Sequence, residues 1–145
     1  MRIREGFSLS ELAIVLACLC IIVLIAVPCL AKLNQEWSLW CGTWVVEGSL
    51  QWGRMYSISS NAPLALEIEP GGRRFYWADL STGQAYGHTI RDLPARVRIV
   101  SSPAKRLRYF PKGNAAPAGT LVLQGDAGRY RVIVNPAGRI RVQRE

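Results

Sequence analysis

The stretch Gly6-Phe7-Ser8-Leu9-Ser10-Glu11-Leu12 leads into an apolar run of twenty residues. The run extends from Leu12 to Ala31 and contains no charged residue. Twenty helical residues span about 30 Å, the thickness of the hydrocarbon core of a bilayer. The run is too long for the apolar core of an ordinary secretory signal, which has about 7–15 residues. Pro28 directly before Cys29 does not fit a lipoprotein signal, which needs a small residue there. We therefore predict a membrane-spanning helix over residues 12–31, which excludes a plain cytosolic protein.

The charges on either side of this run predict its orientation. Arg2 and Arg4 precede it, and Lys32 is the only charge directly after it. Positive charges favour the cytoplasmic side, so the N-terminus is expected to stay in the cytoplasm and the C-terminal domain to be exported. With about 110 residues left after Ala31, the chain has room for one water-soluble domain. A polytopic transporter is excluded.

Glu11 is an ionisable group at the mouth of the apolar run, where a charge costs several kcal/mol unless it is paired. Cleavage between Gly6 and Phe7 would create an α-amino group four residues before Glu11. Groups four residues apart are neighbours on a helix, so this amine could pair with the carboxylate of its own chain or of a neighbouring chain.

This combination of residues resembles the N-terminus of type IV pilins. Counted from Phe7, Glu11 is the fifth residue and Pro28 the twenty-second, as in that family. The resemblance implies that a prepilin peptidase removes residues 1–6 after Gly6, that Phe7 is N-methylated, and that Glu11 and the apolar helix act in filament assembly. It also implies other pilins or pseudopilins and an inner-membrane assembly platform as partners. Ser10, where an aliphatic residue is common, and Cys20, where Gly is frequent, depart from the family pattern.

A helical period continues beyond Pro28, which should kink the helix rather than end it. Eight residues fall within one face of roughly 120°, and we expect this face to pack on the rest of the domain: Leu33, Trp37, Trp40, Cys41, Trp44, Gly48, Trp52 and Met55. The polar stretch 57–61 and Pro63 should end the helix. The sequence therefore predicts one helix over residues 7–59.

From residue 64 onward the apolar period becomes two, which is typical of strands. Strands are expected at 64–69 and 74–77, joined by a turn at Pro70-Gly71-Gly72, and at 96–100, 106–110, 120–124, 129–134 and 139–143; residues 79–92 are expected to form a loop. The expected fold is α+β and pilin-like, with a long N-terminal helix packed on antiparallel sheet. Its parts are a leader (1–6), the helix (7–59) and a β-rich periplasmic domain (60–145).

Residues 110–142 also resemble the C-terminal region of the GspH/FimT branch of the pilin family. The matching features are Phe110-Pro111-Lys112-Gly113, Gly119-Thr120-Leu121-Val122-Leu123 and Gly138-Arg139-Ile140-Arg141. The resemblance implies a minor pilin or pseudopilin of the bacterial inner membrane. Such a subunit would belong either to a type II secretion system or to a type IV pilus.

The last third of the chain is strongly basic: residues 96–145 hold eleven Lys and Arg against two Asp and Glu. Four expected strands carry Arg-x-Arg, which places both arginines on one face of a strand. The turn Asn135-Pro136-Ala137-Gly138 favours a hairpin with a three-residue loop between Asn135 and Arg139, which would then pair. This register would gather four arginines on one face: Arg129, Arg131, Arg139 and Arg141.

Two interpretations of these arginines stay open. Guanidinium groups suit bidentate phosphate contacts, which favours nucleic-acid binding without sequence preference. In support, Gly138, Arg139 and Arg141 match the Gly-Arg-x-Arg of FimT-like DNA receptors in natural transformation. Alternatively, the arginines form a solvated face that discourages contact between sheet edges.

Enzymatic activity has little support in the sequence. His88 is the only histidine, and no acidic pair or metal-ligand spacing stands near a nucleophile. We expect no cofactor, no metal and no small-molecule substrate. Cys18, Cys20 and Cys29 lie in the apolar run, which leaves Cys41 alone in the soluble part, so no disulfide framework is expected.

Overall fold

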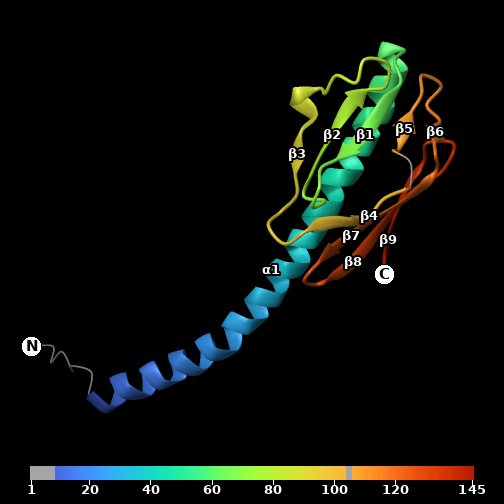
Figure 1. Ribbon diagram of the computed structural model, residues 1–145. Coiled ribbons are helices and arrows are strands. Elements are labelled where there is room, and N and C mark those ends of the chain that lie inside the picture. Colours follow the sequence, from blue (N-terminus) through green and yellow to red (C-terminus); the bar gives the residue numbers. More distant parts are fainter. Residues whose placement is uncertain (1–8, 104–105) are drawn as a thin grey trace, which may run out of the picture. The chain divides into compact units, whose positions relative to one another are not determined.

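The computed structural model describes residues 9–103 and 106–145. The chain divides into two compact units, one ending at Asn34 and one comprising Gln35–Glu145. Helix α1, Leu9–Ser60, contributes to both, and the strands and the short 3-10 helix belong to the second unit. Figure 1 shows the C-terminal part of α1 running behind the strands of the second unit.

Helix α1 continues through Pro28 and ends at Ser60. Asn61 follows in the left-handed region with φ 51°, a conformation that commonly terminates helices. The hydroxyl of Ser57 donates to the carbonyl of Ala62, which closes the end of the helix. The expectation that the helix continues beyond Pro28 is therefore confirmed. The expected kink at Pro28 stays a prediction.

The strands form two antiparallel sheets. The first has the order β3-β2-β1-β5-β6 and the second the order β4-β7-β8-β9. Their bounds are β1 Leu64–Ile68, β2 Arg74–Asp79, β3 Arg91–Asp92, β4 Arg98–Ser101, β5 Arg108–Tyr109, β6 Ala115–Ala116, β7 Gly119–Gly125, β8 Gly128–Val134 and β9 Ile140–Arg144, with the 3-10 helix η1 at Gly87–Thr89. This arrangement confirms the expected α+β, pilin-like fold. The short strand β3 and the helix η1 lie where the sequence predicts only a loop.

Gly72 links the two sheets. Its carbonyl accepts a hydrogen bond from the amide of Ile99 at 2.8 Å. A Cβ at this position would lie 2.1 Å from the carbonyl oxygen of Ile99, and φ is +69°, so only glycine fits the contact. The Pro70-Gly71-Gly72 segment is thus both the predicted hairpin turn and a junction between sheets.

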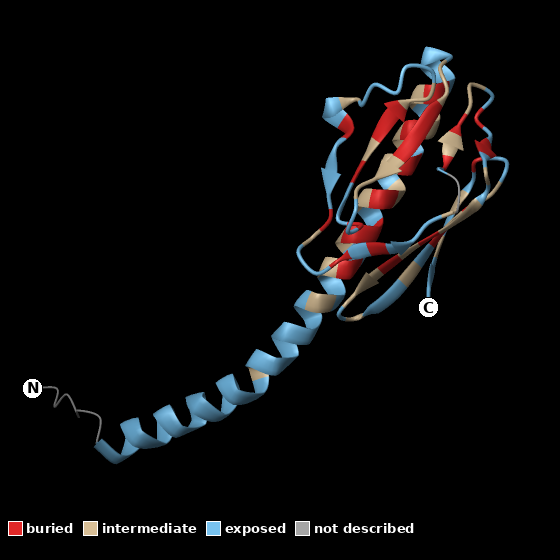
Figure 2. Ribbon diagram, viewed as in Figure 1, coloured by how far each residue is buried: buried red, intermediate tan, exposed pale blue. Residues whose placement is uncertain are grey.

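The face of α1 that packs on the sheets differs from the predicted one. The buried residues of the helix are Leu39, Gly42, Thr43, Val46, Leu50, Gly53 and Ser57. By contrast, Trp37, Trp44 and Met55 are 60%, 61% and 70% exposed. The prediction that the tryptophan face packs on the domain is therefore wrong for these residues, and among the predicted tryptophans that the structure describes only Trp52 packs against the core. Figure 2 shows the buried residues of α1 gathered on its sheet-facing side.

Small residues explain why the helix packs on this face. The ring of Trp77 lies so close to Gly53 that a Cβ there would meet it at 2.5 Å, and a Cβ at Gly42 would meet the side chain of Val97 at 2.9 Å. The Trp77 indole also donates to the carbonyl of Ser49 at 3.1 Å. Trp77 and Val97 thus fill hollows over helix glycines. Trp37, Trp40 and Trp44 of the helix are exposed, whereas Trp52 is half-buried against the core.

Candidate interaction surfaces

The hairpin of β8 and β9 has the register that its turn predicts. The amide of Asn135 donates to the carbonyl of Arg139 at 3.0 Å, and the amide of Gly138 donates to the carbonyl of Asn135 at 2.9 Å. Gly138 adopts φ +73°, the left-handed conformation that closes a three-residue loop. Val134 pairs with Ile140 and Val132 with Val142. The predicted pairing is confirmed.

This register separates the side chains of the hairpin into two faces. Val132 and Val134 are buried in the core. The arginine ribbon is the set of four exposed residues on the other face: Arg129, Arg131, Arg139 and Arg141. Half-buried Ile133 lies among them, directly opposite Arg141. The structure therefore brings the four candidate residues together on one surface.

A fifth arginine shares this surface. Across β7 and β8, Gln124 pairs with Arg129, and across β4 and β7, Arg98 pairs with Gln124. Residues directly opposite each other on paired strands share a face of the sheet. Exposed Arg98 therefore extends the surface to the edge strand β4. The sequence places Arg98 in an expected strand with the Arg-x-Arg pattern, formed there by Arg96 and Arg98, but only the pairing of β4 with β7 reveals its position.

Ion pairs distinguish the arginines of the last third. Arg96 pairs with Asp126 at 3.0 Å and Arg106 with Glu67 at 2.7 Å. Within the ribbon, Arg131 pairs with Glu145. Within residues 9–103 and 106–145, no ion pair forms at the remaining arginines of this surface: Arg98, Arg129, Arg139 and Arg141. These four keep their charge available to an anion.

Arg54 of α1 fixes the turn of the hairpin to the helix. Its guanidinium donates to the carbonyl of Gly113 at 3.0 Å and to the carbonyl of Ala137 at 3.3 Å. The amide of Ala115 adds a hydrogen bond to the carbonyl of Pro136 at 3.0 Å. The turn that joins the two strands of the ribbon is therefore fixed by hydrogen bonds from Arg54 of α1 and from the amide of Ala115. The sequence marks Arg54 only as a polar residue of the helix.

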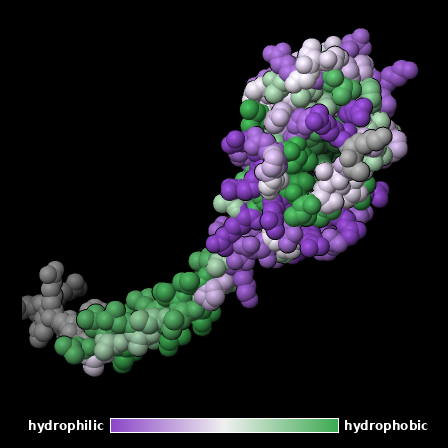
Figure 3. Space-filling model, viewed as in Figure 1, coloured by the Kyte–Doolittle hydropathy of each residue, from purple (hydrophilic) through white to green (hydrophobic). Residues whose placement is uncertain are grey.

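The N-terminal candidates lie on or before α1. Glu11 is exposed in the first turn of the helix, where a carboxylate interacts favourably with the helix dipole. Gly6 and Phe7 lie outside the described residues. The helix is long and apolar enough to cross a membrane, and Figure 3 shows apolar side chains covering its N-terminal part.

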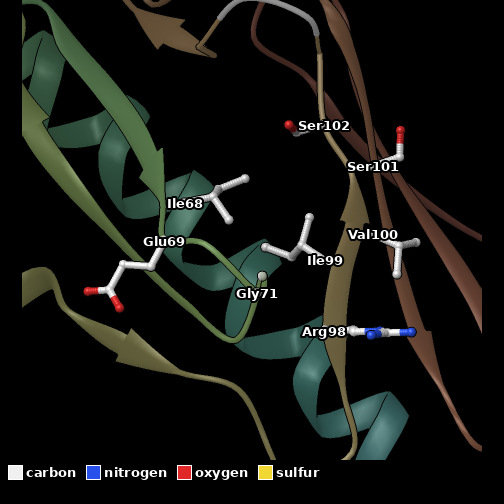
Figure 4. A pocket seen from close by; sticks show the side chains of 9 residues that line it. Ile68, Glu69, Gly71, Arg98, Ile99, Val100, Ser101 and Ser102 are labelled. Atoms are coloured by element: carbon white, nitrogen blue, oxygen red, sulfur yellow. The ribbon is translucent and has the colours of Figure 1, made fainter.

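The described residues of the second unit line several clefts. One, of about 430 Å³, is lined mainly by the β1–β2 turn and β4, with Glu69, Arg98 and two serines on its walls (Figure 4). In the described part of the chain, no group of three or more His, Cys, Asp or Glu residues could hold a metal ion. The arginine ribbon and the exposed faces of α1 are candidate surfaces for a partner.

Comparison with known proteins identifies the family. The family model described as type II transport protein GspH matches residues 34–138. No curated protein matches the chain in sequence. The structure resembles the type IV minor pilin FimU of Pseudomonas aeruginosa, with 17% identity, a TM-score of 0.64, and coverage of 77% of this chain and 92% of FimU.

The structure also resembles the minor pseudopilin EpsH of the type II secretion system of Vibrio cholerae. The identity is 14% and the TM-score 0.56, and the match covers 75% of this chain and 94% of EpsH. At these identities the solved structures show a shared fold, whereas the family model covers well over half of the chain. Fold and sequence agree, and the chain belongs to the GspH family of pilin-like proteins.

Proposed function

We propose that the chain is a minor pilin or pseudopilin, a subunit of a filament in type II secretion or type IV pilus biogenesis. The observation that carries the proposal is the GspH match over residues 34–138, joined to a helix that is long and apolar enough to span a membrane. The helix anchors the subunit in the inner membrane as a single span, with the second unit in the periplasm. Other pilins or pseudopilins and the assembly platform are its partners.

Maturation requires cleavage between Gly6 and Phe7. It leaves the α-amino group of Phe7 four residues before Glu11, which lies in the first turn of α1. N-methylation keeps the charge of that amine and blocks none of its pairing with a carboxylate. The pair neutralises Glu11 where the helix enters hydrocarbon, within one subunit or between neighbours.

Intact mass spectrometry of the chain recovered from membranes tests maturation. The expected mass lacks residues 1–6 and carries one added methyl group. Gly6→Val should leave the full-length mass, because it removes the glycine with which the leader of this family ends, whereas Ser10→Ala should be processed normally. A wild-type chain that retains residues 1–6 in the membrane would contradict the proposal.

A deletion strain distinguishes the two systems. Loss of the chain should abolish either the export of secreted enzymes or the assembly of surface pili, and the full chain should restore the lost activity. Because the two filament types share the pilin N-terminus, this phenotype, rather than the sequence, assigns the machine. A deletion that affects neither process would overturn the proposal.

The arginine surface supports a second candidate function, the binding of DNA phosphates for uptake. The supporting observation is that Arg139 and Arg141 lie together on the exposed face of the hairpin without an ion pair among the described residues. Each phosphate contact contributes about −0.9 to the slope of log affinity against log salt on duplex DNA. Binding of a residue 34–145 fragment to random duplex DNA across a salt series measures this slope.

A matched control separates specific placement from net charge. Arg139→Ala/Arg141→Ala should lower the slope by about two units if both arginines contact phosphate. Arg96→Ala/Arg106→Ala removes the same charge from arginines already paired with Asp126 and Glu67, so its slope should change little. If both double variants lose binding equally, or if the wild-type fragment does not bind near physiological salt, DNA reception is ruled out.

A further inference from the structure

The outward face of α1 carries three large aromatic residues with no covering segment in the second unit. Trp37, Trp40 and Trp44 form a ladder with ring centroids 5.2 Å and 4.6 Å apart. At about 250 Å² for a whole indole, the three leave on the order of 400 Å² exposed. The largest apolar patch on a typical monomer has about 300–600 Å² and is often functional. The ladder is therefore a candidate contact surface.

The outward residues follow a repeat of alternating four and three positions. The tryptophan seam, as we name this set, comprises Trp37, Cys41, Trp44, Gly48, Gln51, Met55 and Ile58. All are exposed except Cys41, which is half-buried. A 3.5-residue spacing over three heptads is the pattern by which two helices pack side by side.

Large and small residues alternate over the first four positions of the seam. They are Trp37, Cys41, Trp44 and Gly48, and a Cβ at Gly48 would meet no atom within 4 Å. A knob from one helix can therefore enter a hole above a small residue of the other. The seam carries no charge, so identical copies do not repel each other along it.

The flanks of the seam are also compatible with a second copy. Within each heptad of the seam, Cys41, Gly48 and Met55 hold the first core position, and Trp44, Gln51 and Ile58 hold the second. In a parallel pair, the residue just before a first core position of one helix faces the residue just after the next second core position of the other helix. Trp40 then faces Val45 of the other copy, which lines a cleft of about 340 Å³ together with Trp44 and Trp52. By the same rule Glu47 faces Trp52, so no like charges meet.

We propose that two copies of this chain pair in parallel through the tryptophan seam, with Trp40 of each copy filling the cleft beside Val45 of the other. The parallel direction rests on the proposed function, because two single-span anchors in one membrane orient both helices alike. A two-fold axis along the helices makes the contact isologous, so each seam residue lies near its own counterpart.

Native Cys41 provides the test. The full chain, with Cys18, Cys20 and Cys29 replaced by alanine, is expressed in membranes and treated with a mild oxidant. Inward-facing cysteines of parallel helices come close enough for a disulfide. A dimer of twice the chain mass is expected on non-reducing gels. Moving the thiol along the seam, by Cys41→Ala with Gln51→Cys, should give the same dimer.

Two control variants make the result specific. Cys41→Ala with Ser81→Cys places the thiol on an exposed turn away from the seam and should stay monomeric. Trp44→Ala should lower the Cys41 dimer yield about tenfold, which corresponds to about 1.4 kcal/mol lost at a central interface tryptophan. Ile90→Ala removes an exposed apolar side chain elsewhere, 43% accessible, and should leave the yield unchanged.

Three outcomes would overturn the pairing. They are a monomeric Cys41 chain that is nevertheless processed and membrane-bound, equal cross-linking at Ser81→Cys, and a cross-linked product whose mass shows a different subunit. The last would assign the seam to a heteromeric contact. A separate measurement tests the proposed function: it fails if intact mass spectrometry shows that the chain keeps residues 1–6.

Discussion

Tyr109 shows how one buried group sets a pH limit on the fold. Its side chain lies in the core against Trp77, and its hydroxyl finds no hydrogen-bond partner among the described residues. Burial raises the pKa of Tyr109 to about 12. The folded state therefore keeps this proton at pH values where the unfolded chain, with a tyrosine pKa near 10, has released it.

The sign of the pH effect follows from the raised pKa. The free energy of unfolding should be unaffected by Tyr109 below pH ~10 and should fall by about 1.4 kcal/mol per pH unit from there to pH ~12. Urea unfolding of a residue 35–145 fragment at several alkaline pH values measures the slope. Tyr109→Phe, which removes the unpaired hydroxyl, should reduce the slope. A variant as pH-sensitive as the wild type would show that other groups cause it.

At the scale of secondary-structure elements, the C-terminal hairpin could be predicted and the packed face of the helix could not. Asn135-Pro136-Ala137-Gly138 allows few turn geometries, and only one register keeps Val132 and Val134 on the core side. Helix α1 offers two stripes of helical period, one aromatic and one of small and aliphatic residues. Size favours the aromatic stripe, but the depth of the hollow above Gly53, visible only once Trp77 is placed, decides the packing.

Two helix glycines test this packing as a matched pair. Gly53→Ala forces a methyl group against the Trp77 ring and should lower the free energy of unfolding by about 1–3 kcal/mol, despite the better helix propensity of alanine. Gly48→Ala places the same methyl group in open space and should raise it by up to about 1 kcal/mol. Urea unfolding of the residue 35–145 fragment measures both. Equal effects of the two variants would contradict the packed face.

The clamp from α1 to the hairpin turn makes a second prediction at this scale. Arg54→Ala removes the donors to the carbonyls of Gly113 and Ala137 and should destabilise the domain by about 1–3 kcal/mol. Amide hydrogen exchange at Gly138 should accelerate with it. Arg96→Ala breaks only an exposed pair with Asp126 and should cost at most about 1 kcal/mol. Unchanged exchange at Gly138 in the Arg54 variant would show that the turn is held by the other contacts.

For the whole molecule, the excess of positive charge lies in the last third of the chain, and the sequence alone does not show which surface carries it. Residues 32–95 hold five Lys and Arg against six Asp and Glu, and residues 96–145 hold eleven against two. The sequence places the excess in the last strands, yet only the sheet order β4-β7-β8-β9 shows Arg98 on the same face as the ribbon. The sequence of a strand does not predict whether this face binds an anion, because solvated arginines and phosphate-binding arginines have the same alternating pattern.

Assembly and the arginine surface should therefore be separable in the full chain. Glu11→Ala should lower the fraction of subunit recovered with sedimented filaments at least about tenfold, because it removes the carboxylate that we propose pairs with the α-amino group of Phe7 at the membrane surface. Arg139→Ala/Arg141→Ala should leave that fraction unchanged. Glu36→Ala, which removes an exposed carboxylate paired with Arg144, controls for charge loss outside the membrane. If the double arginine variant also fails to assemble, the ribbon is a contact between subunits rather than a surface left free for an anion.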